Sequence, residues 1–388
     1  MCICAAAARA QRTRPKIPLF RSSGNECLST KGHLASAVPA SPEEVHSIHR
    51  QADKLDHYLD RIARNLASQS FKPVETLYNQ YQHEAGTIIP SVVPYEETPP
   101  ATKRADVFPG AQPINAEATE GDGIVLVVHA KYDKETSRLM KVVVCSGFVV
   151  DASVTRQDQG DTIVTCAHTL DEMYRHIKYQ SNNFELSSNT FSFIIPSNSR
   201  NPAIPRLTTR ILSSMPRADA IVLEARPTNS NSLRLRPLPL TPFPVYLGTP
   251  VLTHLFGSPD PPVIQHSIAR TKEPVCRVDV DGTETPVSWL DGHAYRRWGH
   301  GVMLGYRSYT GLEVEAGISS VLPHILTSIL PTPGSSGGPL VNAQTGCVVG
   351  MTSGRRMDNR IEGERGWGCS AESIFEMFSL PGFMPASN

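Results

Sequence analysis

The chain carries the stretch PGSSGGPL at residues 333–340. Three glycines bracket two serines, and the strand-forming run CVV follows at residues 347–349. Glycine suits positions where a backbone takes positive φ or approaches another group closely. A serine in such a loop can present its hydroxyl beside amide N–H groups, which is what a nucleophile needs to stabilise an oxyanion. The stretch alone is equally typical of an ordinary Gly/Ser turn between strands, so residues elsewhere must decide.

A histidine and a carboxylate stand upstream in suitable settings. His168 ends the β-branched run TIVTCAH at residues 162–168, and Asp219 stands at the start of an apolar run. With Ser336 they follow the order His, Asp, Ser, which is the chymotrypsin order and differs from that of subtilisin and the α/β-hydrolases. The three residues are therefore candidates for a base, an orienting acid and a nucleophile.

Four short blocks resemble trypsin-like serine peptidases, and most of all the HtrA/Deg type. The blocks stand in the family's order over roughly residues 120–382; each alone is a weak signal, and together they are a strong one. They are SGFVV at 146–150, TCAH at 165–168, ADAIVL at 218–223 and GSSGGPL at 334–340.

This resemblance implies a fold, an activity and roles for residues. The fold is all-β, with two six-stranded antiparallel β-barrels, here carrying an N-terminal helical extension and a short C-terminal helix. The activity is serine endopeptidase action through His168, Asp219 and an acyl-enzyme on Ser336, since the nucleophile directly precedes Gly-Gly and Ser335 does not. The backbone N–H groups of Gly334 and Ser336 would form the oxyanion hole, and neither a cofactor nor a metal is expected. The alternative is a catalytically silent binding or scaffold protein on the same fold.

The chain departs from zymogen-type members of the family at Ser335. Those members carry Asp at this position, and the Asp pairs with a freed N-terminus. Serine cannot form that ion pair, so activation by cutting to a new N-terminus is not expected.

The segments around the serine loop also suggest how a polypeptide substrate binds. The stretch ending in Thr332 should line the first pocket, and it offers no acid for Lys or Arg, so we predict a small or aliphatic residue before the cut. The strand after the loop would pair with the extended substrate backbone, and Arg355 and Arg356 beyond it could attract acidic positions. The expected substrate-binding residues are Leu330, Pro331, Thr332, Met351, Thr352, Ser353 and Gly354.

Composition and charge exclude several classes of protein. The 32 prolines among 388 residues favour β-rich, loop-rich structure over a helix bundle. Lys plus Arg equal Asp plus Glu at 37 each, so the formal charge of zero argues against a general nucleic-acid or membrane-surface binder. No run approaches 18 apolar residues, so no membrane span is expected.

The eight cysteines indicate the redox setting. They form no metal-type pair of clusters, and Thr169 stands where secreted trypsin-like enzymes commonly carry a cysteine after the histidine. We therefore expect a reduced, intracellular protein with mostly buried, unpaired thiols.

The N-terminal part divides at residue 40. Residues 1–40 are Arg-rich and acid-poor, which is typical of a mitochondrial transit peptide; a disordered tail of a cytoplasmic protein is the alternative. Residues 41–118 should form a helix over 41–67, opened by a capping box, and then a Pro-rich linker or strap. The helix carries a heptad stripe that could pack on its own domain or make a homo-oligomer, formed by Val45, Ile48, Ala52, Leu55, Leu59, Ile62 and Leu66.

Residues 119–385 are expected to form the protease domain. Six short apolar runs between 124 and 223 predict one barrel, and residues 258–300 look like an insertion, either a lid or a surface elaboration. The second half resumes with runs at 251–256, 302–304, 312–318, 324–330 and 347–353, and a closing helix is predicted over 371–378. No room for a PDZ domain follows that helix.

Overall fold

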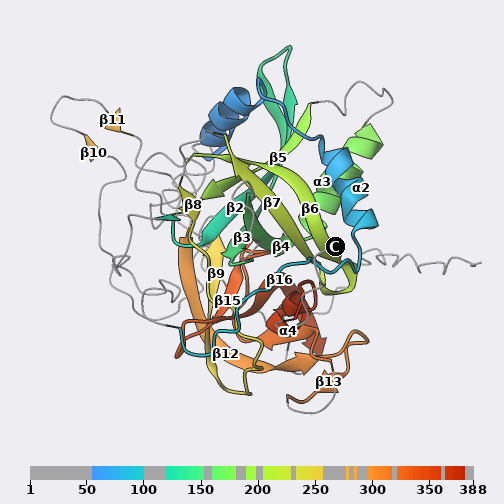
Figure 1. Ribbon diagram of the computed structural model, residues 1–388, viewed down its shortest axis with the longest axis vertical. Coiled ribbons are helices and arrows are strands. Elements are labelled where there is room, and N and C mark those ends of the chain that lie inside the picture. The colour runs from blue at the N-terminus through green and yellow to red at the C-terminus, as the bar shows by residue number, and fades with distance from the viewer. Residues whose placement is uncertain are drawn as a thin grey trace, which may run out of the picture. The chain divides into compact units, whose positions relative to one another are not determined.

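The computed structural model shows a chain built mainly of β-strands (Figure 1). It describes residues 55–99, 119–152, 160–180, 189–197, 204–228, 233–256, 277–278, 284–285, 296–316, 321–359 and 363–380. The predicted segment 1–40, the first part of the predicted helix (41–54, with Val45, Ile48 and Ala52), residues 100–118 of the predicted linker and most of the predicted insertion 258–300 lie outside these residues.

The first barrel is closed by six antiparallel strands in the order β2-β3-β4-β7-β6-β5. All six were predicted from their apolar runs. They are β2 (Ile124–Asp133), β3 (Arg138–Val150), β4 (Asp161–Cys166), β5 (Thr190–Pro196), β6 (Arg206–Met215) and β7 (Ala220–Pro227).

Strands of this barrel are apolar on both faces because both faces are covered. On β2, Val125 and Val127 point into the barrel core, whereas Leu126 and Val128 contact a second cluster beneath the helix at 55–66. Successive side chains of a strand face opposite sides, so this strand has to be a continuous apolar run rather than an alternating one.

The second barrel also has six strands in its ring, which confirms the predicted fold class. Strand β12 closes it, since the first half of β12 pairs with β9 and the second half pairs with β14. The ring consists of β9 (Pro250–Phe256), β12 (Arg296–Arg307), β14 (His324–Thr327), β17 (Gly363–Ser370), β16 (Val348–Asn359) and β15 (Pro339–Asn342). Short pairings add β13 (Glu313–Val314) to β12, β1 (Thr119–Glu120) to β8 (Arg234–Leu235), and β10 (Arg277–Val278) to β11 (Glu284–Thr285).

Three expectations for the second half need correction. Residues 296–300 belong to β12 rather than to an insertion, and among the described residues of the run predicted at 312–318 only Glu313–Val314 form a strand. Strand β17 was not predicted, because its sequence GERGWGCS is glycine-rich. Gly366 is needed there, since a Cβ atom on it would lie 2.0 Å from the carbonyl oxygen of Ile329.

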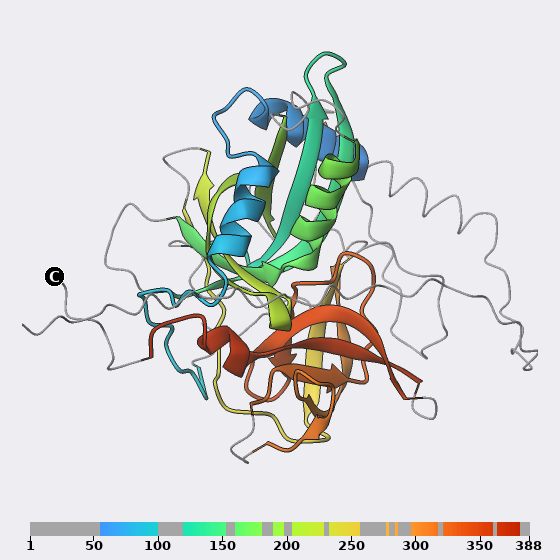
Figure 2. The same ribbon diagram turned by 90° about the vertical axis from the view of Figure 1, so that its right-hand side faces the viewer.

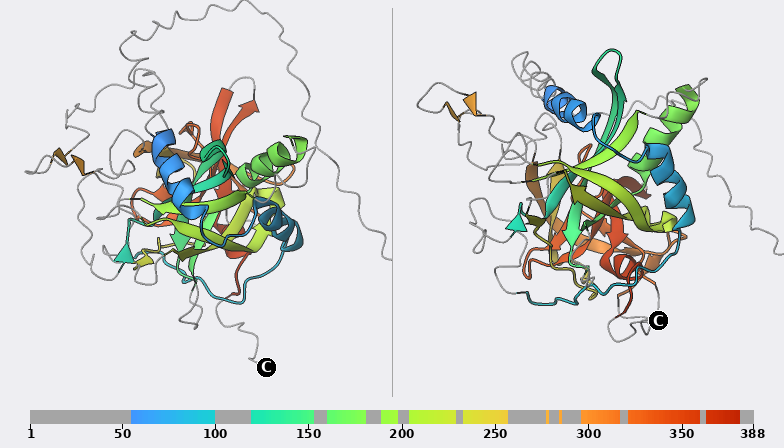
Figure 3. Two further views of the ribbon diagram at one scale, coloured as in Figure 1. Left: turned by 90° about the horizontal axis from the view of Figure 1, so that it is seen from above. Right: turned by 45° about the horizontal axis from the view of Figure 1, so that its top comes forward.

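Helices cover the outside of the first barrel (Figure 2 and Figure 3). The helix at 55–66 buries Leu59, Ile62 and Leu66 in the cluster that contains Phe191 and Phe193, so this part of its stripe is used within the chain. Helix α3 (His168–Gln180) was not predicted as a helix. The short closing helix α4 (Ala371–Phe375) confirms the predicted C-terminal helix.

The predicted linker at 68–118 contains a helix, α2 (Val74–His83). Its buried residues Val74, Leu77 and Tyr81 recur at helical spacing, a signal hidden among the surrounding prolines. The chain after α2 runs as a strap, bridging Ala85 to Ser214 in the first barrel and Ile89 to Phe378 after α4. The division between 41–118 and 119–385 stays a prediction.

None of the helices within the described residues is long and apolar enough to cross a membrane.

The packing of the helix at 55–66 generates a testable prediction. Leu59 is fully buried against the first barrel, so Leu59→Ala should lower the free energy of unfolding by about 2–5 kcal/mol. Urea denaturation followed by circular dichroism measures this. The matched control is Asp56→Ala, an exposed position on the same helix, and equal midpoints for the two variants would contradict the packing role.

Candidate active site

His168 and Asp219 are brought together by the pairing of two neighbouring strands. Strand β4 ends opposite the start of β7, with Cys166 in register with Ala220. His168 follows β4 as the first residue of α3, and Asp219 immediately precedes β7. The register of one strand pair therefore fixes the spacing of these two candidate residues.

The Asp219 carboxylate is held by three donors around the histidine. Its Oδ2 lies 2.6 Å from His168 Nδ1, and its Oδ1 accepts hydrogen bonds from the backbone N–H groups of Ala167 at 3.1 Å and His168 at 2.9 Å. Asp219 has a φ of 56°, in the left-handed region, at the end of the 3₁₀ turn η2 (Pro216–Ala218). A carboxylate on Nδ1 favours the imidazole tautomer that leaves Nε2 as a proton acceptor.

The environment also changes the basicity of His168. Burial by itself lowers the pKa of His168, but the hydrogen bond and the negative charge of Asp219 outweigh burial and raise the pKa above its ordinary value. The imidazolium form is therefore stabilised next to Asp219, as a proton-accepting base requires.

Ser336 lies on the loop before β15, and this loop packs on the first barrel. Gly337 has a φ of 84°, and a Cβ atom on it would lie 2.0 Å from the carbonyl oxygen of Ser146 and 2.4 Å from Thr165 Oγ1. The carbonyl of Ser336 accepts a hydrogen bond of 2.8 Å from the N–H of Ser146. Only glycine fits at 337, and it brings Ser336 against the end of β4, near His168.

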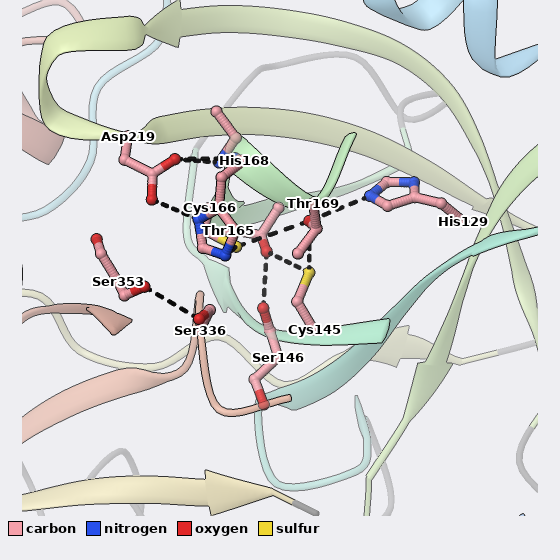
Figure 4. Close-up of polar contacts among 11 residues, drawn as sticks. His129, Cys145, Ser146, Thr165, Cys166, His168, Thr169, Asp219, Ser336 and Ser353 are labelled. Carbon is pink, nitrogen blue, oxygen red and sulfur yellow. Dashed lines mark hydrogen bonds and ion pairs between the residues drawn. The ribbon is translucent and has the colours of Figure 1, made fainter. Parts of the chain in front are cut away.

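The hydroxyl of Ser336 donates to the carbonyl oxygen of Ser353 at 3.0 Å (Figure 4). Among the described residues no hydrogen bond joins this hydroxyl to His168. His168 Nε2 lies 3.9 Å from Cys166 Sγ. The structure thus places the candidate base and acid in direct contact and the candidate nucleophile in a different hydrogen bond.

The backbone N–H groups of the serine loop divide into used and unused donors. Ser335 donates to Thr332, Gly337 donates to Thr352, and Gly338 donates to the carbonyl of Ser335. Within the part of the chain that the structure describes, the N–H groups of Gly334 and Ser336 have no hydrogen-bond acceptor. Both residues are partly exposed.

Of the three residues predicted to line the first pocket, only Pro331 lines the small cavity that the described residues form there. Pro331 lines a cavity of about 10 Å³, the space of roughly one water molecule. The Leu330 side chain is 41% exposed. The hydroxyl of Thr332 does not face this cavity, since it bonds to the backbone carbonyl of Phe256 at 2.8 Å.

The predicted substrate strand is only partly available for pairing. Met351 pairs with Pro339 on one side and Cys369 on the other, and Thr352 bonds through its N–H and carbonyl to the serine loop. From Ser353 onward β16 has β17 on one edge, and no described strand covers the other edge. Ser353 and Gly354 are therefore the predicted residues that a substrate backbone could reach.

Sequence reasoning gave no role to several residues around the site. Ser146 supports the serine loop through its N–H, as noted, and its hydroxyl donates to the carbonyl of Gly334 at 2.9 Å. Behind His168, Thr169 Oγ1 contacts Cys145 Sγ at 3.2 Å and Cys166 Sγ at 3.7 Å. The position of Ser146 in the SGFVV block was the only available signal.

The thiols next to the site are buried and not disulfide-bonded. Burial raises the pKa of Cys166 well above its ordinary value. Cys166 therefore stays a neutral thiol beside the imidazole, and Ser336 is the better candidate nucleophile. Within the described residues, no group of three or more His, Cys, Asp or Glu side chains could hold a metal ion.

Comparison with known proteins covers solved structures, curated sequences and protein families. Among solved structures, the fold is similar to the MamO protease domain from Magnetospirillum magneticum in its apo form, with 13% identity, coverage of 64% of this chain and 93% of that chain, and a TM-score of 0.34. It is also similar to Rv3671c from M. tuberculosis in an inactive form, with 16% identity, coverage of 73% and 94%, and a TM-score of 0.35.

No curated protein matches the chain in sequence. The family described as the trypsin-like peptidase domain matches residues 145–351, which are more than half of the chain and contain His168, Asp219 and Ser336. The chain therefore belongs to the trypsin-like peptidase family.

Proposed function

We propose that this protein is a serine endopeptidase that cuts polypeptides through His168, Asp219 and Ser336. The observation that carries the proposal is the 2.6 Å contact between His168 Nδ1 and the Asp219 carboxylate. The N–H groups of Gly334 and Ser336, which have no acceptor among the described residues, support it. A base, an orienting acid and an oxyanion site are the parts that acyl transfer to serine needs.

The first step is a rotation of the nucleophile. The Ser336 hydroxyl leaves the carbonyl of Ser353 and turns toward Nε2 of His168. Ser336 is partly exposed, and rotamer changes at the protein surface take picoseconds to nanoseconds, so this rotation is fast compared with a catalytic turnover. The hydrogen bond to Ser353 describes a resting state of the site.

Substrate binding favours the same rotation. A substrate strand on the open edge of β16 would offer a backbone N–H to the carbonyl of Ser353. That N–H and the Ser336 hydroxyl compete for one acceptor. The bound substrate therefore releases the hydroxyl at the place where its scissile carbonyl arrives.

The chemistry then proceeds in two half-reactions. Ser336 Oγ bonds to the scissile carbonyl carbon as Nε2 of His168 takes the hydroxyl proton, and the carbonyl oxygen becomes an anion held by the N–H groups of Gly334 and Ser336. Each such donor contributes roughly 3 kcal/mol to the transition state. The tetrahedral intermediate expels the amine, which receives the proton from His168, and leaves an acyl-enzyme. Water, deprotonated by His168, then releases the acid and restores Ser336.

The alternative is a silent scaffold, and one observation favours it. The Ser336 hydroxyl bonds to Ser353 rather than to His168. A scaffold, however, gives no reason for the N–H groups of Gly334 and Ser336 to stay unused beside that hydroxyl.

A fluorophosphonate probe discriminates between the two functions. The full-length protein should be labelled covalently, and Ser336→Ala should abolish labelling because the attacking oxygen is gone. Intact-protein mass spectrometry measures the adduct. The matched control is Ser308→Ala, a partly exposed serine in the turn between β12 and β13 and outside the site, which should label like the wild type. A folded wild-type protein that takes up no probe would favour the scaffold.

The pH dependence follows from the raised pKa of His168. Because the base must be neutral to accept a proton, the acid limb of kcat/KM should have its midpoint above about 6.5, the ordinary histidine value. Asp219→Asn removes the charge and leaves the burial, so the pKa of His168 should then fall below the wild-type value. NMR titration of the imidazole measures both proteins, and an unchanged pKa in Asp219→Asn would refute the role of Asp219.

A further inference from the structure

Ser335 faces away from the catalytic groups and is fully buried at 0% exposure. Its Oγ lies 2.9 Å from the backbone N of Phe256 and 2.8 Å from Thr332 Oγ1. Thr332 Oγ1 in turn lies 2.8 Å from the carbonyl oxygen of Phe256. Three residues thus form a small, closed polar network at the end of β9.

The protons of this network can be assigned from donor rules alone. The N–H of Phe256 can only donate, so Ser335 Oγ accepts from it. The carbonyl of Phe256 can only accept, and Thr332 offers the shorter contact, so the Thr332 hydroxyl donates there. The Ser335 hydroxyl is left to donate to Thr332 Oγ1. Every donor in the ring has an acceptor, and no member carries a charge.

This network fixes the peptide groups on both sides of the unused N–H groups. The N–H of Ser335 closes the turn from Thr332 at 3.0 Å, and Gly334 inside that turn has a φ of 85°. A Cβ atom on Gly334 would lie 2.8 Å from Cδ1 of Phe256, so the ring packs directly on this glycine. The hydroxyl of Ser146 holds the Gly334 carbonyl from the first barrel. The loop is therefore anchored by one strand of each barrel.

We propose that Ser335 and Thr332 are positioning residues that keep the oxyanion hole formed, by anchoring its loop to the backbone of Phe256. This inference rests on the proposed function. It assigns to two neutral hydroxyls the role that an ion pair with a freed N-terminus would otherwise have at position 335. A carboxylate at that fully buried position would be costly without a cation beside it. The site is then competent without any cut in the chain.

The kinetic test uses p-nitrophenyl acetate, a small ester whose turnover needs the nucleophile and the oxyanion hole and hardly any side-chain specificity. Ser335→Ala and Thr332→Val each remove one hydroxyl without adding bulk. Both should lower kcat about 10- to 100-fold with KM changed less than about threefold, which is less than the ~10²–10³-fold loss of a whole oxyanion donor. Thr332→Ser keeps the hydroxyl and should stay within about threefold of wild type.

Two readouts separate positioning from a general loss of structure. The rate of fluorophosphonate labelling should fall with kcat, because the phosphonyl oxygen also uses the oxyanion hole. The pKa of His168 should not move, because the His168–Asp219 pair lies on the first barrel. If Ser335→Ala fails to fold, the Thr332→Val and Thr332→Ser pair still decides the matter.

The outcomes distinguish the two proposals. Unchanged kcat in folded Thr332→Val overturns the positioning role while leaving the proposed peptidase function intact. Equal losses in Thr332→Val and Thr332→Ser also overturn it, since the hydroxyl would then not matter. A wild-type protein that neither labels nor hydrolyses the ester overturns the proposed function, and the positioning role falls with it.

Discussion

The site depends on one close contact between the two barrels, the approach of Gly337 to the ends of β3 and β4. No side chain fits at 337, because the Ser146 carbonyl and the Thr165 hydroxyl occupy the space that a Cβ atom would need. Packing at this distance is possible only for glycine in a positive-φ conformation. Without it, the loop that carries Ser336 would lie farther from the strand that delivers His168, and the candidate residues would belong to two unrelated surfaces.

The two barrels contribute different parts of the proposed catalytic site. The first barrel holds His168 and Asp219, whose spacing follows from the β4–β7 register. The second barrel holds the serine loop through Phe256 and offers the open edge of β16. Ser146 belongs to the first barrel but bonds to the loop of the second at both its N–H and its hydroxyl. Relative movement of the barrels would therefore change the separation of the candidate nucleophile and the candidate base. The strap from Ala85 to Ile89 links Ser214 of the first barrel to Phe378 after α4.

The sequence predicted those parts that have a local signature. The order of His168, Asp219 and Ser336 and the apolar runs of the first barrel are readable because each depends on neighbouring residues. Strand β17 could not be predicted, because its glycines are required by close contacts with the backbone of other strands. Helix α2 was hidden because prolines on both sides outweighed a short periodic pattern. The support of the serine loop was out of reach for a further reason. Ser335 and Thr332 form hydrogen bonds with the backbone of Phe256. Every residue type has the same backbone groups, so the sequence at position 256 does not indicate these bonds.

The proposed support of the serine loop by Ser335 and Thr332 is uncharged, which affects how the site should respond to pH. An ion pair to an N-terminal amine is lost once the amine deprotonates, which happens above its ordinary pKa of about 7.7–8.0 because the paired carboxylate raises that pKa. Serine and threonine hydroxyls do not titrate in this range, so the geometry of Gly334 and Ser336 does not change with pH there. The only titrating group in the proposed catalytic step is then His168, whose pKa is raised by Asp219. The raised pKa means that His168 becomes neutral only at higher pH. The geometry of the serine loop and the protonation state of the base therefore depend on different groups. The shape of the site is set by uncharged contacts, and its protonation state is set by one carboxylate.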